Sequence, residues 1–415
     1  MEKLKSLSSL PDRLCFLREI TEMMYGNRSA LIRSCSGVLF CLALGTASLA
    51  AQERLRLDWP ELARVIVQRM ALEQGETVLL VAHPEMFRDL IPPLRYEVMK
   101  AGAVDLGVID VLPSGEWDSN VIQQGAGPSR EVYQEIFKDI DASVMLPGAT
   151  PKHPAYAAIQ DILRAGKSRT VHFHWLENRS AYPLSGQPLP DPSAIDAFYQ
   201  LAVLNSDYDA LTQIQGRFEQ AMRKREIRVT TPLGTDLRFR IGDRPVNRQD
   251  GDASKARTDH GVILIDREIE IPAGAVRVAP LEETVRGTIA FPPSQWNGGP
   301  VTGLKLEFVE GRVLKITAES GKEHVEAEME QAGDVGRRFR EFALGFNPQL
   351  TVPERNPWFP YYGYGAGVVR LSLGDNSELG GAVQGERPYV RWNFFTDATV
   401  RVGNEVWVRD GKLVK

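Results

Sequence analysis

Cysteine is scarce in this chain of 415 residues, and its positions exclude two kinds of chemistry. The three cysteines, Cys15, Cys35 and Cys41, all lie near the N-terminus, ahead of an expected cleavage point near Ala50–Ala51. A mature chain without them forms no disulfide and has no thiol nucleophile. The sequence also contains no recognisable nucleophile elbow for Ser-His-Asp catalysis.

A large excess of charge of one sign is also missing. The chain has 49 Lys and Arg against 54 Asp and Glu, which gives a formal net charge of −5. This balance gives no electrostatic reason to bind nucleic acid or an anionic membrane. The hydrophobic content of 43% and the charged content of 25% are those of an ordinary globular protein. We therefore expect no nucleic-acid partner.

The N-terminal segment has the pattern of a secretory signal peptide. Arg28 and Arg33 precede the apolar run Val38–Leu44, and small residues follow it up to the expected cleavage point near Ala50–Ala51. The run is too short to span a bilayer comfortably. We expect residues 1–51 to be an N-terminal extension and signal peptide, with a buried helix as the alternative. The mature protein would be periplasmic or secreted and would keep no stable membrane anchor.

Helix-like and strand-like segments alternate through the first half of the chain. Residues 59–74 have helical periodicity and end at Gly75, and residues 77–82 form a continuous apolar strand. The same alternation predicts helices over 86–101, 130–137 and 154–165 and strands over 104–111, 142–146 and 168–173. This order predicts an α/β domain with a doubly wound parallel sheet, over residues 52–225.

The second half has a different pattern, with short strands separated by turn signals. Strands are expected over 227–231, 237–241, 262–265, 304–309 and 313–318. One helix is expected over 322–342, and Gly403-Asn404 and Asp410-Gly411 are typical of hairpin turns. We predict a mixed α+β domain with mostly antiparallel strands over residues 226–415, after a linking helix over 208–224.

Four segments of the second half carry a family resemblance. They are TPLGTDL at 231–237, IPAGAV at 271–276, REFALGFNP at 340–348 and the glycine-rich segment Tyr361–Asp397. In this order they resemble the thermophilic aminopeptidase family, which includes aminopeptidases T and S. The order of the segments carries more weight than any one motif. The resemblance implies a ligand cleft between two domains, a homodimer and two divalent metal ions that activate water.

The residues at the metal-ligand positions that the resemblance implies are mostly not ligands. The bridging Glu falls on Ala275, the first His falls on Arg370, and a later His-x-Asp pair falls on Arg391 and Asn393. Only Glu341 keeps a ligand-type side chain. A guanidinium stays protonated and cannot ligate a metal, and one carboxylate cannot hold two ions. We therefore expect a degenerate site with no metal cofactor.

One alternative keeps a metal site. The metal ligands could have moved to other carboxylates of the same segment, namely Asp375, Glu378, Glu386 and Asp397. The protein would then hold two divalent ions, such as zinc or cobalt.

The arginines suggest an anion-binding site in place of the metals. Arg370 and Arg391 could form a planar fork for a carboxylate or phosphate. Asn393 would lie beside this fork, and Glu341, the candidate catalytic residue, would take a ligand amine. Alternatively, each arginine pairs with Glu341 or Asp397 and fills the former site without any ligand.

Aromatic residues and histidines add weaker signals. Tyr361 and Tyr364 could wall the ligand pocket, or they could belong to the core or a dimer face. His172 and His174 lie two apart on an expected strand, so their side chains face the same way. That spacing suits zinc, but a histidine pair at the end of a sheet is the simpler interpretation.

The sequence therefore predicts an exported, aminopeptidase-like protein with a degenerate metal site. It would bind, or process without metal, a small anionic or zwitterionic ligand such as a peptide or amino acid. The first alternative is an active metal-dependent aminopeptidase that releases N-terminal residues from peptides. A structural or interaction protein would follow if the arginines were paired internally.

Overall fold

The structure is a computed structural model that describes residues 57–112, 119–149, 153–175, 181–183, 188–261, 263–386 and 389–415. The predicted signal peptide over residues 1–51 lies outside this part of the chain. Residues Leu55–Lys415 form one compact unit. None of the helices in the described ranges is long and apolar enough to cross a membrane.

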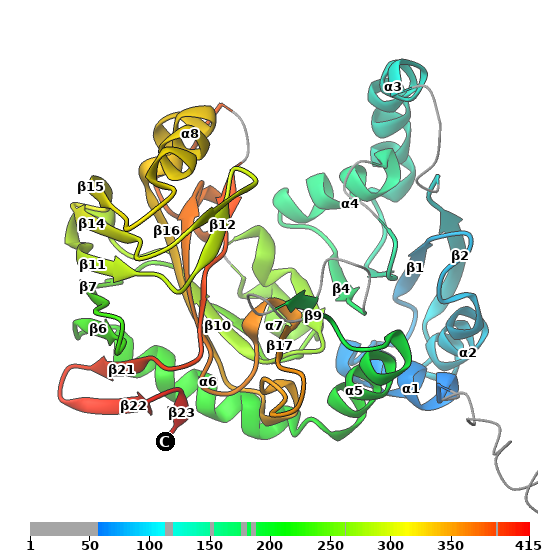
Figure 1. Cartoon of the computed structure of the whole chain (residues 1–415). Helices are drawn as coiled ribbons and strands as arrows, with labels where there is room; N and C mark the ends of the chain where they lie inside the picture. Colours follow the sequence, from blue (N-terminus) through cyan, green and yellow to red (C-terminus); the bar gives the residue numbers. More distant parts are fainter. Residues whose placement is uncertain are drawn as a thin grey trace, which may run out of the picture. The chain divides into compact units, whose positions relative to one another are not determined.

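The first sheet has five parallel strands in the order β2-β1-β3-β4-β9. These strands are β1 (Thr77–Ala82), β2 (Val104–Asp110), β3 (Ala142–Met145), β4 (Arg169–Phe173) and β9 (Glu268–Ile271). The accompanying helices are α1 (Trp59–Met70), α2 (Ile91–Lys100), α3 (Ser119–Phe137), α4 (Pro154–Arg164) and α5 (Pro192–Asn205). Figure 1 shows them grouped around the sheet.

Helices cover both faces of this sheet because its strands are apolar on both sides. In β1, Val78 and Leu80 pack in one hydrophobic cluster with residues of α1, α2 and α5. Leu79 and Val81 pack in another cluster with residues of α3 and α4. Alternate residues of one strand therefore face two different layers. This confirms the predicted doubly wound arrangement.

After the long helix α6 (Tyr208–Met222), two antiparallel sheets follow. The six-stranded sheet contains β8 (Asn247–Gln249), β10 (Ala275–Val278), β16 (Phe339–Gly345), β18 (Val369–Gly374), β19 (Val390–Arg391) and β20 (Phe394–Phe395). The eight-stranded sheet contains β6 (Ile227–Thr230), β7 (Asp236–Phe239), β11 (Arg286–Ala290), β14 (Lys305–Val309), β15 (Arg312–Thr317), β21 (Thr399–Val402), β22 (Glu405–Arg409) and β23 (Lys412–Leu413). The predicted antiparallel second half is confirmed.

The remaining elements are small. They are the strand pairs β5 (Ala181–Pro183) with β17 (Trp358–Pro360) and β12 (Ser294–Trp296) with β13 (Gly299–Val301), and the helices α7 (Lys255–Asp259) and α8 (Lys322–Ala332). Strand β9 lies in the first sheet although it follows residue 226, so the two halves of the chain share one sheet. The domain boundary near residue 225 stays a prediction.

Two predicted elements are wrong in their extent or type. The strand expected over 262–265 is not formed, because Leu264–Asp266 is a short 3-10 helix in which the Asp266 carboxylate accepts the N–H of Ile263. The helix expected over 322–342 ends at Ala332. The next residue, Gly333, has φ 73°, a left-handed backbone that stops a helix, and the buried strand β16 follows.

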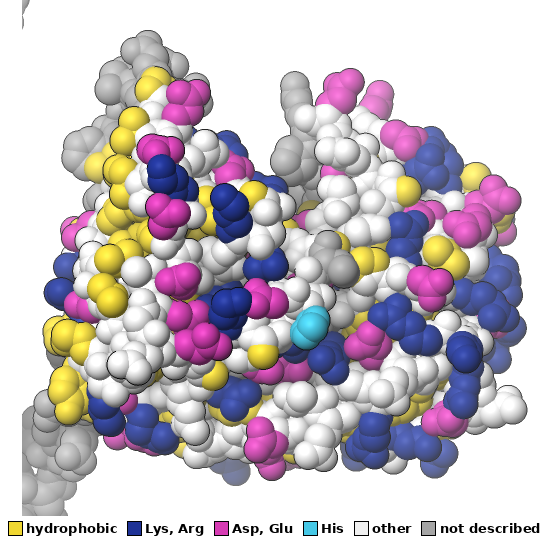
Figure 2. Space-filling model, turned by 180° about the vertical axis from the view of Figure 1, so that it is seen from behind, with side chains coloured by type: hydrophobic (Ala, Val, Ile, Leu, Met, Phe, Trp, Pro, Cys, Tyr) yellow, Lys and Arg dark blue, Asp and Glu magenta, His cyan; other side chains and the backbone are white. Residues whose placement is uncertain are grey.

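Charged side chains of both signs cover the surface. In Figure 2, basic side chains gather toward the right of the view, with acidic side chains among them. On the eight-stranded sheet, Arg228 pairs with Asp236 at 2.7 Å, and Arg338 next to that sheet pairs with Asp334 at 2.9 Å. Neighbouring carboxylates therefore neutralise part of this basic surface.

Candidate functional site

Three neighbouring strands of the six-stranded sheet place charged side chains on one face. The register sets Arg277 of β10 opposite Ala343 of β16, and Ala343 opposite Arg370 of β18. Two residues along each of these strands, Glu341 of β16 lies opposite Ser372 of β18. Because side chains two apart on a strand share a face, all five side chains lie on the same side of the sheet.

Glu341 is completely buried and is surrounded by donors. Its Oε2 accepts hydrogen bonds from Nε and Nη2 of Arg277, both at 3.2 Å. Its Oε1 lies 3.0 Å from Nη2 of Arg370 and accepts a hydrogen bond from the Ser372 hydroxyl at 3.1 Å. Both carboxylate oxygens of Glu341 are therefore occupied.

The arginines keep Glu341 ionised. Burial by itself would raise the pKa of this carboxyl group, but the charges of Arg277, Arg370 and Arg340 outweigh it and hold the pKa far below its usual range. Burial by itself would lower the pKa of Arg277, but the combined charges of Glu341, Tyr364, Glu378 and Glu270 raise it well above its usual value. Glu341 is thus a fixed anion, and its predicted catalytic role stays a prediction.

A third arginine enters the same site through an irregularity in β16. Pairing between β16 and β18 shifts between Phe339 and Glu341, so Arg340 is an extra residue in its strand. Such a bulge turns a side chain away from its regular direction. Arg340 is 2% exposed and donates from Nη2 to Oε1 of Glu378, the same atom that accepts from Nη2 of Arg277 at 3.1 Å.

We call these five residues the arginine cluster: Arg277, Arg340, Arg370, Glu341 and Glu378. It contains three guanidinium groups and two carboxylates. The Nε atoms of Arg340 and Arg370 are buried and have no hydrogen-bond acceptor among the described residues. The cluster therefore has an excess positive charge and unused donors.

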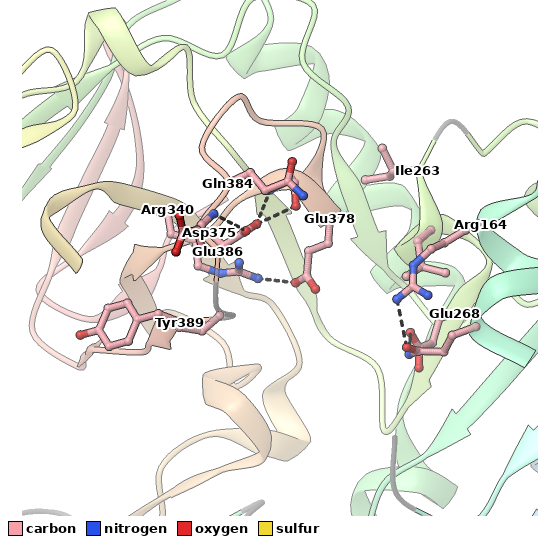
Figure 3. A pocket seen from close by; sticks show the side chains of 14 residues that line it. Arg164, Ile263, Glu268, Arg340, Asp375, Glu378, Gln384, Glu386 and Tyr389 are labelled. Atoms are coloured by element: carbon pink, nitrogen blue, oxygen red, sulfur yellow. Dashed lines mark hydrogen bonds and ion pairs between the residues drawn. The ribbon is translucent and has the colours of Figure 1, made fainter. Parts of the chain in front are cut away.

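A cavity of about 660 Å³ adjoins the arginine cluster (Figure 3). Arg340 and Glu378 lie on one wall, and Arg164 of α4 and Glu268 of β9 lie on the opposite wall. The other lining residues are Gln160, Ile263, Leu264, Asp375, Ser377, Gln384, Gly385, Glu386, Tyr389 and Val390. The cavity thus presents charges of both signs.

A second polar group lies on the neighbouring strands β4 and β9. His172 Nδ1 is 3.1 Å from Oε1 of Glu268, which also accepts a hydrogen bond from the Tyr156 hydroxyl at 3.1 Å. The rings of His172 and His174 have centroids 3.7 Å apart, on the same side of their strand. Burial, and then the neighbouring His172, lower the pKa of His174 well below its usual value. The sequence analysis missed Glu268 and Glu270, although their alternation with Ile269 in a short strand could have pointed to a shared face.

The two tyrosines that the sequence analysis singled out lie between the arginine cluster and the polar residues of β4 and β9. The Tyr364 hydroxyl donates to Glu270, and its ring centroid lies 5.9 Å from Cζ of Arg370. Tyr361 packs on Tyr364 with ring centroids 4.9 Å apart and on His174 at 5.0 Å. Both tyrosines are buried, and neither is among the residues that line the cavity, so their ligand role stays a prediction.

The structure brings Arg370 to Glu341, but it does not bring Arg391 there. Arg391 Nη1 lies 2.7 Å from Glu328 of α8, and its Cζ lies 3.4 Å from the ring centroid of Trp296. Asn393 donates from Nδ2 to the backbone carbonyl of Leu371 at 3.0 Å. The fork of Arg370 and Arg391 is therefore not formed here, and the ligand roles of Arg391 and Asn393 stay predictions.

Sequence reasoning missed Arg277, Arg340 and the pairing role of Glu378. Arg277 could have been found, because it lies two residues after Ala275 and so faces the same side of a strand. Among the described residues, no group of three or more His, Cys, Asp or Glu side chains could hold a metal ion.

Comparison with known proteins gives a family resemblance over part of the chain and a shared fold. A family model described as thermophilic metalloprotease (M29) matches residues 207–352. The structure is similar to 2,5-dihydroxypyridine dioxygenase from Pseudomonas putida KT2440, with a TM-score of 0.57 and 14% identity over 86% of this chain and 96% of that chain. It is also similar to AmpT from Thermus thermophilus, with a TM-score of 0.55 and 17% identity over 86% of this chain and 99% of that one. A search of curated proteins gave no match.

These findings define an aminopeptidase-like fold. The predicted resemblance to the thermophilic aminopeptidase family is confirmed by the matched segment and by the similarity to AmpT. At these identities, the solved structures show the shared fold alone.

Proposed function

We propose that this aminopeptidase-like protein uses the arginine cluster in place of a metal centre and binds a small ligand that carries a carboxylate. The ligand would be anionic or zwitterionic, such as an amino acid or a short peptide. The observation that carries the proposal is the contact of Glu341 with Arg277 and Arg370 on one buried sheet face.

The donors around Glu341 do not fit the two metal ions that the family resemblance implies. Ala275 has no ligand atom, and the two oxygens of Glu341 are occupied by guanidinium and hydroxyl groups. Three guanidinium groups close to one carboxylate would repel a divalent cation by several kcal/mol in a buried site. The carboxylate of Asp375, a possible relocated ligand, accepts N–H groups of Ser377 and Gly385 at 2.9 and 3.1 Å.

The cavity suits a ligand with both charges. Arg340 on one wall could bind a carboxylate, and the acidic group of Glu268 on the opposite wall could bind an ammonium group. Paired charges of this kind select for a zwitterion because each end of the ligand meets an opposite charge. The proposal also includes export of the mature chain and a homodimer.

The competing function is a metal-dependent aminopeptidase, which the family resemblance favours. Elemental analysis of the purified protein, together with hydrolysis of leucine p-nitroanilide with and without added zinc or cobalt, separates the two. We expect no stoichiometric metal and no metal-dependent turnover. Two bound equivalents of metal with metal-dependent hydrolysis would refute the proposal.

Binding is measured separately, by thermal unfolding with L-leucine and with L-leucinamide, which lacks the carboxylate. At about ten times its Kd, a ligand that binds only the folded state adds about 1.4 kcal/mol of stability. We expect this stabilisation from leucine and none from leucinamide. Equal stabilisation by the two compounds would show that the carboxylate is not recognised.

A further inference from the structure

Glu378 differs from the other members of the arginine cluster in its exposure. Its side chain is 41% exposed, whereas those of Arg277 and Arg340 are 8% and 2% exposed. It lies on the cavity wall, and one of its oxygens accepts hydrogen bonds from both arginines. A half-exposed carboxylate thus covers two buried guanidinium groups.

We propose that Glu378 is an internal competitor for the carboxylate of the ligand. It occupies a subsite formed by Arg277 and Arg340, and an incoming carboxylate displaces it into the cavity. This inference rests on the proposed function, because it assigns the carboxylate end of the proposed ligand to a particular pair of arginines.

The hydrogen bonds of Arg340 favour this exchange. Its Nη2 donates to Glu378, while its buried Nε has no hydrogen-bond acceptor in the described part of the chain and lies 4.0 Å from Oε1 of Glu341. A guanidinium binds a carboxylate best through two parallel hydrogen bonds, from Nε and one Nη. A free carboxylate could use both donors, which the tethered Glu378 does not.

The displacement needs only a side-chain rotation. Glu378 lies in the 3-10 turn Ser377–Leu379, and hydrogen bonds on either side hold its backbone. Asp375 accepts the N–H of Ser377 at 2.9 Å, and Asn376 accepts the N–H of Val383 at 2.7 Å. The turn can therefore stay in place while the exposed carboxylate swings toward the cavity.

The exchange also predicts which ligands bind best. Replacing one carboxylate by another leaves the charge of the arginine cluster unchanged, so a neutral amide cannot take the place of Glu378. Once displaced, Glu378 remains on the cavity wall, close enough to meet a cation on the same ligand. A zwitterion such as an amino acid then gains a second contact that a simple carboxylate lacks. The subsite is therefore expected to prefer zwitterions over acetate.

The test is calorimetric titration of the full chain with acetate, L-leucine and L-leucinamide at constant ionic strength. In Glu378→Gln, the competitor loses its charge while its size is kept, and we expect acetate to bind at least about tenfold more tightly than in the unaltered protein. The preference for leucine over acetate should shrink, because the displaced carboxylate is gone. Glu378→Asp keeps the charge but shortens the reach, so it should tighten acetate binding to a smaller extent.

Matched variants control for charge and folding. Glu386→Gln removes the same charge from the same cavity, and Glu386 is not among the described partners of Arg277 or Arg340. The affinity of Glu386→Gln for acetate should stay within about twofold of that of the unaltered protein. Arg340→Gln should lose carboxylate binding. Circular dichroism and thermal unfolding of each variant establish that it is folded.

The outcomes separate this inference from the proposed function. If Glu378→Gln and Glu378→Asp bind acetate no more tightly than the unaltered protein, while Arg340→Gln loses binding, then carboxylates bind but Glu378 does not compete. If no carboxylate binds to the unaltered protein or to either Glu378 variant, both the competition and the proposed function are wrong.

Discussion

Replacing Glu341 by Gln tests whether the arginine cluster depends on its central carboxylate. The change keeps the shape of the side chain but removes the negative charge that Arg277 and Arg370 contact. Because the residue is completely buried, water cannot replace that charge. The remaining guanidinium groups would then be left with Glu378 as the one carboxylate of the cluster.

The size of the effect follows from this burial. Removing one partner of a buried ion pair costs about 3–5 kcal/mol, because the other charge stays buried and uncompensated. Unfolding entropy is about 2.1 cal/mol/K per residue, so a unit of roughly 360 residues loses about 4–7 °C in Tm for that cost. An exposed pair is worth much less. Glu61→Gln, which breaks the exposed pair with Arg64, should therefore cost less than about 1 kcal/mol.

The pH dependence gives a second check on Glu341→Gln. The arginines hold the pKa of Glu341 below its ordinary value of about 4.3, so the folded state binds this proton more weakly than the unfolded state. The contribution of the ionised carboxylate is therefore complete above about pH 5 and is lost as the pH falls below the ordinary value.

Chemical denaturation of Glu341→Gln, Glu61→Gln and the unaltered protein between pH 3.5 and 8 measures both the loss of stability and its dependence on pH. The stability difference between the unaltered protein and Glu341→Gln should be constant from pH 6 to 8 and should narrow in acid. A difference below about 1 kcal/mol at pH 7, or one that widens as the pH falls, would refute the assignment of Glu341 as the central anion of the cluster.

Two further predictions concern residues around the cluster. Arg391 contacts Glu328 and Trp296, so Arg391→Ala should lower the free energy of unfolding by about 1–3 kcal/mol, as measured by chemical denaturation. Its affinity for acetate should stay within about twofold of that of the unaltered protein. Loss of acetate binding in a folded variant would instead support the predicted ligand role of Arg391. Burial and His172 lower the pKa of His174, so stability should fall as the pH drops from about 6.5, by at most about 1.4 kcal/mol per pH unit. His174→Gln should flatten this slope between pH 5 and 7, and an unchanged slope would assign the titration to another group.

The sequence predicted the layers of the fold because its hydrophobic periods differ between the two halves. A strand such as Thr77–Ala82, apolar at every position after Thr77, is typical of burial between two layers of helices, and the structure places helices on both faces. The position of Glu268–Ile271 could not be predicted in this way. This strand joins the parallel sheet far along the chain, and its pairing depends on contacts with Arg169–Phe173 that no local pattern encodes.

The site was predicted only where residues share one strand face or a family motif. The motifs pointed to Glu341 and Arg370, which are in contact, and the alternative of internal pairing described that contact. Arg340 was missed because regular alternation places neighbouring residues on opposite faces, whereas a bulge brings Arg340 beside Glu341. The contact of Arg391 with Glu328 depends on how helix Lys322–Ala332 packs, which the motif around Arg391 does not specify.

The arginine cluster keeps positive charge where the family resemblance implies metal ions, but it cannot supply the same chemistry. A guanidinium attracts and orients an anion, as a metal ion does. It does not act as a Lewis acid that lowers the pKa of a bound water, and because it stays protonated it does not act as a base at neutral pH. Glu341, held ionised between Arg277 and Arg370, has no free oxygen to activate water either. The cluster is therefore suited to recognising a carboxylate, and any hydrolysis at this site would require groups outside it.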